Sequence, residues 1–162
     1  MSTNSTPSGA QSEFRKLCVV GLGYVGLPTA AVFASRGLDV VGFDVNADTV
    51  ALINDGQVHI VEPDLDILVN GAVARGKLRA TTEAETADVF ILAVPTPFTD
   101  GNKPDLSYLE SAVKTIAPVL APGNMVILES TSPVGTTDRV SQWLASHRPD
   151  LKLPHDHGEQ SN

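Results

Sequence analysis

Short apolar runs alternate along the chain with longer segments in which apolar residues recur at helical spacing. The apolar runs predict strands at 16–21, 39–44, 77–82, 87–95 and 124–130. The helical spacing predicts helices at 24–37, 46–56, 62–76, 105–120 and 135–147, and Ser107 with Glu110 has the spacing of a capping box. Strands that alternate with helices are typical of a parallel sheet covered on both faces. We therefore predict an α/β fold in which a single domain, residues 15–149, forms a doubly wound parallel sheet.

The two ends of the chain lack this alternation. Residues 1–14 are rich in Ser and Thr and have neither the basic start nor the apolar stretch of a signal peptide, so we expect a disordered tail. Residues 150–162 gain Pro, His and Asp, which is typical of a linker or a ragged C-terminus. Because His155 and His157 in such a polar segment are more often solvated than metal-bound, no metal site is predicted.

Composition narrows the class of partner. The chain of 162 residues has a formal net charge of −8, which argues against a nucleic acid or an anionic membrane as partner. No apolar run approaches the roughly 20 residues of a membrane-spanning helix. The single cysteine, Cys18, lies in the apolar run "LCVV", so it reads as a small buried hydrophobe and no disulfide framework is possible. Together these features predict a cytoplasmic protein.

A glycine motif marks the junction between the first predicted strand and the first predicted helix. In "VVGLGYVGLPTAA", Gly21, Gly23 and Gly26 form the pattern G-x-G-x-x-G. In a Rossmann-type sheet the first glycine permits a tight turn, the second lets the backbone approach a pyrophosphate, and the third lets the helix pack closely on the strand. The amides at the helix start would then face the phosphates, and these are the amides of Leu22, Tyr24 and Val25.

An acidic residue ends the second predicted strand. Asp44 stands where a carboxylate accepts hydrogen bonds from a ribose diol. No arginine follows it, and a carboxylate repels a 2′-phosphate, so the predicted cofactor is NAD rather than NADP. The alternative is that the glycines only form a tight turn and that Asp44 caps the next helix. The joint placement of strand, glycines, helix and acid favours the NAD interpretation.

Two later loops bring hydroxyl side chains to the same edge of the sheet. "AVPTPF" and "ESTSPVGTT" each follow an apolar strand, and open α/β sheets bind ligands at the carboxyl ends of their strands. Thr96, Thr131 and Thr137 are therefore candidates for contacts with cofactor. The residues alone leave a second interpretation equally open, because Ser and Thr beside Pro commonly form turns and caps.

Several segments together resemble the N-terminal, NAD-binding domain of the UDP-glucose/GDP-mannose dehydrogenase family. The resemblance runs in matching order from Lys16 to Gln160 and rests on "VVGLGYVGLPTAAVFASRG", "GFDVN", "HIVEPDL", "AVPTPF", "PDLSYLESA" and "VILESTSPVGTT". The segments "HIVEPDL" and "ESTSPVG" point to the branch of the family that oxidises UDP-N-acetyl-D-mannosamine.

This resemblance implies a four-electron oxidation, in which C6 of the sugar passes from alcohol to carboxylate and two NAD⁺ are reduced. Carried over by position, it implies NAD contacts at Tyr24, Val25, Asp44, Thr96 and Thr137, with Thr131 nearby. It also implies that Thr96 lies near the reacting end of the cofactor.

The family's chemistry also needs residues that the resemblance places after Gln160. The family uses a cysteine thiolate to trap the aldehyde and a lysine to handle protons, so no catalytic residue is expected in this chain. Cys18 cannot substitute, because burial in a core strand raises the pKa of a thiol. A UDP-sugar is therefore expected to bind only with the missing C-terminal part, and the chain alone is predicted to be inactive.

The sheet is also expected to lack its last strand. The doubly wound order has a sixth strand, which the family places just after residue 162, as it does the downstream catalytic domain. The run 124–130 should then form an open, apolar edge of the sheet. Such an edge predicts poor solubility or self-association of the isolated chain.

Three functional hypotheses follow. The first is the NAD-binding part of a nucleotide-sugar 6-dehydrogenase, with UDP-glucose and UDP-N-acetylglucosamine as alternative substrates. The second is a stand-alone module that binds NAD without turnover. The third is another Rossmann oxidoreductase, such as a hydroxyacid or acyl-CoA dehydrogenase, which is disfavoured because no histidine follows a strand as a general base.

Overall fold

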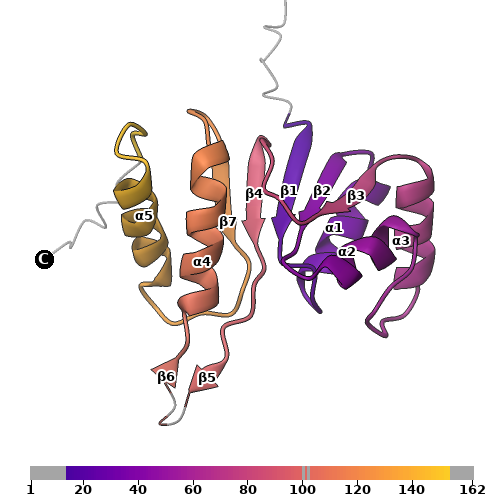
Figure 1. Cartoon of the computed structure of the whole chain (residues 1–162), viewed down its shortest axis with the longest axis horizontal. Helices are drawn as coiled ribbons and strands as arrows, with labels where there is room; N and C mark the ends of the chain where they lie inside the picture. Colours follow the sequence, from indigo (N-terminus) through magenta and orange to yellow (C-terminus); the bar gives the residue numbers. More distant parts are fainter. Residues whose placement is uncertain (1–13, 100, 102, 154–162) are drawn as a thin grey trace, which may run out of the picture.

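Five parallel strands form the central sheet of the protein, whose computed structural model describes residues 14–99, 101 and 103–153. The strands lie in the order β3-β2-β1-β4-β7. Their bounds are β1 (Lys16–Val20), β2 (Asp39–Phe43), β3 (Leu78–Thr81), β4 (Val89–Leu92) and β7 (Met125–Leu128). Because all neighbours are parallel, their carboxyl ends share one edge, at the bottom of Figure 1. This order confirms the predicted doubly wound sheet.

Helices cover both faces of the sheet (Figure 1). One face carries α1 (Gly26–Ser35), α2 (Ala47–Asn54) and α3 (Leu65–Ala74), and the other carries α4 (Ser107–Ile116), the short 3₁₀ helix η1 (Ala117–Val119) and α5 (Thr136–His147). Among the described residues, no helix is long and apolar enough to cross a membrane.

Strand β1 shows why the sheet strands read as continuous apolar runs. Leu17 and Val19 are buried in one hydrophobic cluster with residues of α1 and α3. Cys18 and Val20 point the other way, into a second cluster with residues of α4 and α5. A strand that is buried on both faces has no polar alternation, which is the pattern that predicted a parallel sheet.

A small hairpin interrupts the loop between β4 and α4. Strands β5 (Phe98–Thr99) and β6 (Lys103–Pro104) pair antiparallel and lie beyond the carboxyl edge of the main sheet (Figure 1). The sequence predicted no strand between the apolar run at 87–95 and the helix at 105–120. Strands of two residues are too short to leave an alternating pattern, so this element was missed.

The ordered packing continues past the expected domain boundary at residue 149. The Arg148 guanidinium donates hydrogen bonds to the carbonyls of Ala117 and Leu120 at 2.8 and 2.6 Å. Leu151 and Leu153 then pack against the cluster formed with α4 and α5. The expected N-terminal tail and the rest of the C-terminal segment, residues 1–13 and 154–162, lie outside the described residues.

Strand β7 lies at one end of the sheet. Its residues alternate between exposed and half-buried, and Met125 and Ile127 are 46% and 39% exposed. These two side chains border an apolar groove of about 220 Å³ whose floor includes Val89 and Ile91 of β4. Within the described residues, β7 is therefore an edge strand with apolar side chains in contact with solvent.

Candidate functional site

The turn between β1 and α1 is built on two glycines whose lack of a side chain the fold requires. Gly21 has φ +93°, and its amide donates to the carbonyl of Phe43 at 2.8 Å. A Cβ on Gly26 would lie 1.8 Å from the carbonyl oxygen of Gly21. Gly21 therefore makes the tight turn and Gly26 allows the helix to approach the strand, as the motif predicted.

Gly23 differs from these two glycines. A Cβ built on it would meet nothing within 4 Å, so no packing within the protein demands a glycine there. Gly23 lines a cavity instead. A bare backbone beside open space is the arrangement that lets a ligand approach the main chain closely.

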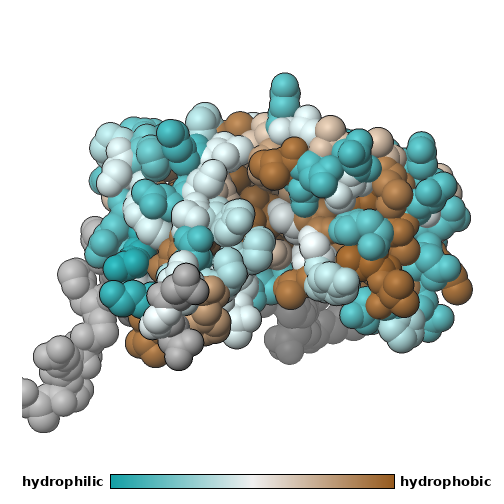
Figure 2. Space-filling view, turned by 60° about the horizontal axis from the view of Figure 1, so that its bottom comes forward, coloured by the Kyte–Doolittle hydropathy of each residue, from teal (hydrophilic) through white to brown (hydrophobic). Residues whose placement is uncertain are grey.

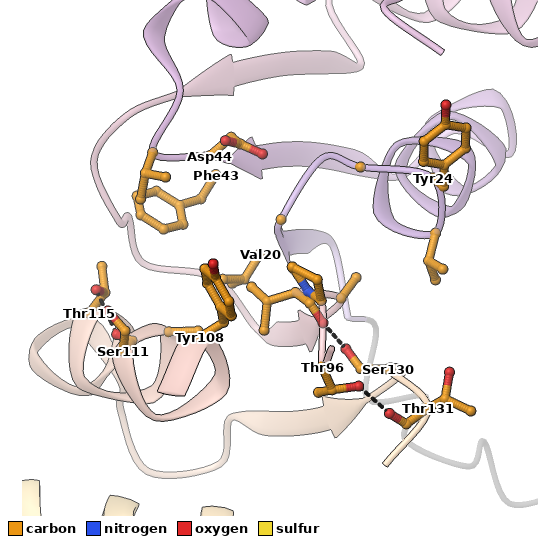
Figure 3. Close-up of a pocket in the computed structure, with 18 residues that line it drawn as sticks. Val20, Tyr24, Phe43, Asp44, Thr96, Tyr108, Ser111, Thr115, Ser130 and Thr131 are labelled. Atoms are coloured by element: carbon orange, nitrogen blue, oxygen red, sulfur yellow. Dashed lines mark hydrogen bonds between the residues drawn. The ribbon is translucent and has the colours of Figure 1, made fainter. Parts of the chain in front are cut away.

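The cavity has a volume of about 730 Å³ and lies at the carboxyl ends of β1, β2, β4 and β7 (Figure 3). Figure 2, which brings this edge of the molecule forward, shows apolar surface inside a hollow in the middle of the face. Of the residues predicted to contact the cofactor, the cavity is lined by Gly21, Gly23, Tyr24, Val25, Asp44, Thr96 and Thr131. Segments that follow four different strands, spread from Gly21 to Thr131, thus meet at one site.

Asp44 follows β2 directly and faces the glycine turn. Its Oδ2 accepts a hydrogen bond from the Leu22 amide at 2.8 Å, and its Oδ1 accepts one from the Asn46 amide at 2.9 Å. The Leu22 amide is therefore already used within the protein, and its predicted role toward phosphate is wrong. A carboxylate has further lone pairs on both oxygens, so Asp44 can still accept hydrogen bonds from a ligand.

The start of α1 offers its amides to the cavity. Val25 is the N-cap residue, and it makes no side-chain hydrogen bond to the first turn. The N-terminus of a helix carries a partial positive charge. In α1 the Leu27 amide already donates to the Gly23 carbonyl at 3.1 Å and Pro28 has no amide hydrogen, so the amides that can serve a ligand precede Leu27. Tyr24 and Val25 are 72% and 48% exposed beside the cavity, so this helix end is open to an anion.

The far wall of the cavity is formed by the loops after β4 and β7. The Thr96 hydroxyl donates a hydrogen bond to the Thr131 carbonyl, and the Ser130 hydroxyl donates to the Val94 carbonyl at 2.6 Å (Figure 3). These bonds cross between the two loops and fix Thr96 and Thr131 side by side. Each hydroxyl keeps its lone pairs for a ligand.

Thr137 is not part of this group. It is an exposed residue in the first turn of α5 and does not line the cavity. Its neighbour Thr136 is the buried one, and the Thr136 hydroxyl donates to the Pro133 carbonyl at 2.7 Å. The turn-forming hydroxyl at this helix start is therefore that of Thr136, the neighbour of the predicted residue.

Helix α4 supplies a wall of the cavity that the sequence did not identify. Tyr108, Ser111, Ala112 and Thr115 line the cavity from this helix, opposite Asp44 and Phe43 (Figure 3). Their spacing of three and four residues places them on one helix face. That spacing was visible in the sequence, but a face of small and polar residues is also what a solvated helix surface shows.

Cys18 lies beneath this site rather than in it. Its side chain is fully buried in β1, and burial raises the pKa of its thiol to about 12. The direction is the one predicted from the sequence. A thiol with such a pKa stays protonated at neutral pH and is not a nucleophile.

Comparisons with known proteins agree on one family. Residues 15–161 match the UDP-glucose/GDP-mannose dehydrogenase family, NAD binding domain. The chain is 60% identical over 150 residues to an NDP-N-acetyl-D-galactosaminuronic acid dehydrogenase of Ralstonia nicotianae, which covers 93% of this chain and 36% of the relative. It is 59% identical over 152 residues to a UDP-N-acetyl-D-mannosamine dehydrogenase of Campylobacter jejuni, with 93% and 37% covered.

A solved structure gives the same result. The UDP-D-ManNAc dehydrogenase of Pyrococcus horikoshii superposes with a TM-score of 0.80 at 43% identity, over 85% of this chain and 33% of that one. The chain thus spans little more than a third of the length of the curated relatives it matches.

Proposed function

Because the chain belongs to the UDP-glucose/GDP-mannose dehydrogenase family and spans its NAD-binding domain, we propose that NAD binds in the cavity at the carboxyl edge of the sheet. The observation that carries this proposal is the meeting of the glycine turn, the open start of α1 and the Asp44 carboxylate in one cavity. Its volume of about 730 Å³ is in the range of cofactor sites.

The pyrophosphate is proposed to lie at the start of α1. The bare backbone of Gly23 lets it come close, and the amides that precede Leu27 at this helix end donate hydrogen bonds to it. Tyr24 and Val25 contribute through their backbone atoms. Gly21 and Gly26 act indirectly, because they set the turn that aims these amides.

The adenosine half is proposed to lie between Asp44 and helix α4. The Asp44 carboxylate accepts hydrogen bonds from the ribose diol and repels the 2′-phosphate of NADP. Val45, Tyr108 and Ala112 offer apolar surface for the adenine ring. This charge beside the ribose is the basis of the preference for NAD.

The nicotinamide half is then proposed to lie over β4 and β7, near Thr96 and Thr131. When bound, NAD⁺ supplies a hydride acceptor at this end. The two threonine hydroxyls orient that end by hydrogen bonding, and Thr96 is the residue we place nearest to the chemistry. A contact with Thr137 rests on the family resemblance alone and stays a prediction.

For the whole protein we propose oxidation of UDP-N-acetyl-D-mannosamine to the corresponding uronate with reduction of two NAD⁺. Support comes from the similarity to the Campylobacter jejuni enzyme, and the similarity to the Ralstonia nicotianae enzyme favours another N-acetylhexosamine as the alternative. The buried Cys18 cannot form a covalent intermediate with an aldehyde. We therefore propose that the 162-residue chain binds NAD without turnover and binds the UDP-sugar only together with a catalytic domain.

The experiment that tests this function is calorimetric titration of the chain with NAD⁺ and with NADP⁺. We expect NAD⁺ to bind at least about tenfold more tightly than NADP⁺, because of the charge of Asp44. Equal affinities, or no binding of NAD⁺, would overturn the proposal. In a parallel assay with UDP-N-acetyl-D-mannosamine, NADH absorbance should stay flat, and its rise would overturn the proposed inactivity.

We also propose that the isolated chain self-associates through β7, with a second copy of the chain as the occupant. The backbone N–H and C=O groups on the edge of β7 can pair with another strand, and the side chains of Met125 and Ile127 line the apolar groove beside β4. A cytoplasmic location, expected from the sequence, stays a prediction.

A further inference from the structure

A hydrogen bond joins helix α1 to the end of β7 across the intervening strand. The Thr29 hydroxyl donates to Oε1 of Glu129 at 2.7 Å, although the two residues are 100 positions apart. Strand β4 lies between β1 and β7 in the sheet, so this contact bridges over β4. Neither residue lines the cavity.

Each partner is coupled to a different wall of the cavity. The Thr29 amide donates to the carbonyl of Val25, the residue that caps α1. Glu129 directly precedes Ser130 and Thr131, which line the far wall, and its amide donates to the Leu92 carbonyl at 3.0 Å. The Thr29–Glu129 bond therefore ties the wall that begins α1 to the wall that follows β7.

We propose that Glu129 is a positioning residue of the cofactor site. By holding Thr29, it sets the spacing between the helix start that receives the pyrophosphate and the Thr96–Thr131 pair that receives the nicotinamide half. This inference rests on the proposed binding of NAD. It adds that binding of the nicotinamide half of NAD, and not of the adenosine half, depends on the Thr29–Glu129 contact outside the cavity.

Loss of the Thr29–Glu129 bond should affect binding of the nicotinamide half of NAD and not binding of the adenosine half. Asp44 follows β2 and Glu129 follows β7, so β1 and β4 lie between the two residues in the sheet. Loss of the bridge leaves the Asp44 contacts to Leu22 and Asn46 in place. ADP reaches only the adenosine and pyrophosphate subsites. Its affinity should therefore not depend on the Thr29–Glu129 hydrogen bond.

Three variants of the full chain test this proposal by calorimetric titration with NAD⁺ and with ADP. Thr29→Val removes the donor at nearly constant shape, and Glu129→Ala removes the acceptor. Each should weaken NAD⁺ binding about fivefold, the effect of one hydrogen bond, and change ADP binding less than twofold. The double variant should bind NAD⁺ no more weakly than either single one, because both remove the same contact.

Glu129→Gln serves as the matched control. Its side-chain carbonyl still accepts from Thr29, so NAD⁺ binding should stay within about twofold of the unmutated chain. Equal weakening of NAD⁺ and ADP in the Thr29→Val variant, or unchanged NAD⁺ binding in both single variants, would overturn the positioning role alone. Failure of the unmutated chain to bind either ligand would overturn the proposed function, and this inference with it.

Discussion

Oδ2 of Asp44 accepts a hydrogen bond from the Leu22 amide at 2.8 Å, so the residue that follows β2 also holds the glycine turn after β1. The same carboxylate accepts from the Asn46 amide at the start of α2. A single side chain thus fixes the backbone of the turn and faces the cavity in which we place the adenosine ribose. Because Asp44 has both roles, its mutation should change both the stability of the chain and its preference between cofactors.

Asp44→Asn should lower both stability and cofactor discrimination. Asparagine has one side-chain carbonyl and cannot serve both amides as a carboxylate does, so the free energy of unfolding should fall by about 1–2 kcal/mol. Loss of the charge should also reduce the preference for NAD⁺ over NADP⁺ by about tenfold. Urea unfolding and calorimetric titration measure the two effects, and a variant with unchanged discrimination would remove Asp44 from the cofactor site.

Substitutions at two glycines of the turn should have different effects, one on stability and the other on NAD⁺ binding. Gly26→Ala places a methyl group where the Gly21 carbonyl stands, so we expect a loss of more than about 2 kcal/mol in unfolding free energy. Gly23→Ala meets no protein atom within 4 Å, so the melting temperature should stay within a few degrees while NAD⁺ binding weakens about tenfold or more. Unchanged NAD⁺ binding in Gly23→Ala would place the pyrophosphate elsewhere.

The strand order, the glycine turn and the acidic residue after β2 could be predicted because each leaves a local signature. Buried parallel strands appear as apolar runs, and the motif fixes glycines at three set positions. The use of the Leu22 amide by Asp44 could not be predicted in this way. It depends on how closely the end of β2 approaches the turn, which no spacing in the sequence reports.

The start of α4 shows a second limit of local signals. The capping-box spacing predicted Ser107 as the cap, but Ser107 is the first helical residue and Leu106 is the N-cap without a side-chain bond. Asp105 instead accepts from the Ser107 amide at 2.9 Å. Two polar residues near one helix start compete for the same amides, and the surrounding chain path decides between them. The cavity-facing residues of α4 were missed for a related reason, because periodicity does not say what a polar face meets.

An ion-pair cluster at the opposite edge of the sheet should make stability depend on acid pH. Glu85 accepts from Arg79 Nη1 at 2.7 Å and from Lys16 Nζ at 3.3 Å, and the hydrogen bonds from Arg79 lower the pKa of Glu85 from 4.5 to about 2. The ionised carboxylate is thus favoured in the folded chain. Its stabilising contribution is complete above about pH 4.5 and is lost as the pH falls toward 2.

Glu85→Gln should remove this part of the pH dependence. The side chain is 31% exposed, so solvent screening limits the contribution to about 1 kcal/mol. Urea unfolding at pH 6 and pH 3 should show a smaller drop in stability for Glu85→Gln than for the unmutated chain. Arg79→Met should flatten the profile in the same way, and a profile identical to that of the unmutated chain in both variants would contradict this origin.

The edge strand predicts concentration-dependent association that one charge should suppress. Ile127 is 39% exposed on β7, and a lysine there would oppose pairing of β7 with a second copy. Light scattering should show the unmutated chain associating at high concentration and Ile127→Lys remaining monomeric. Ile67→Lys, at a 68% exposed position on α3, is the control and should associate like the unmutated chain. A monomeric unmutated chain at high concentration would rule out this interface.

The direction of β1 has a practical consequence for the use of this chain as a reagent. β1 begins at Lys16 and runs for five residues toward the cavity, a distance of about 17 Å. An attachment ahead of Phe14 therefore enters the molecule at the edge opposite to the cavity. A chain immobilised through its N-terminus would present its dinucleotide site to the flowing sample, which is the orientation that a surface-based biosensor requires.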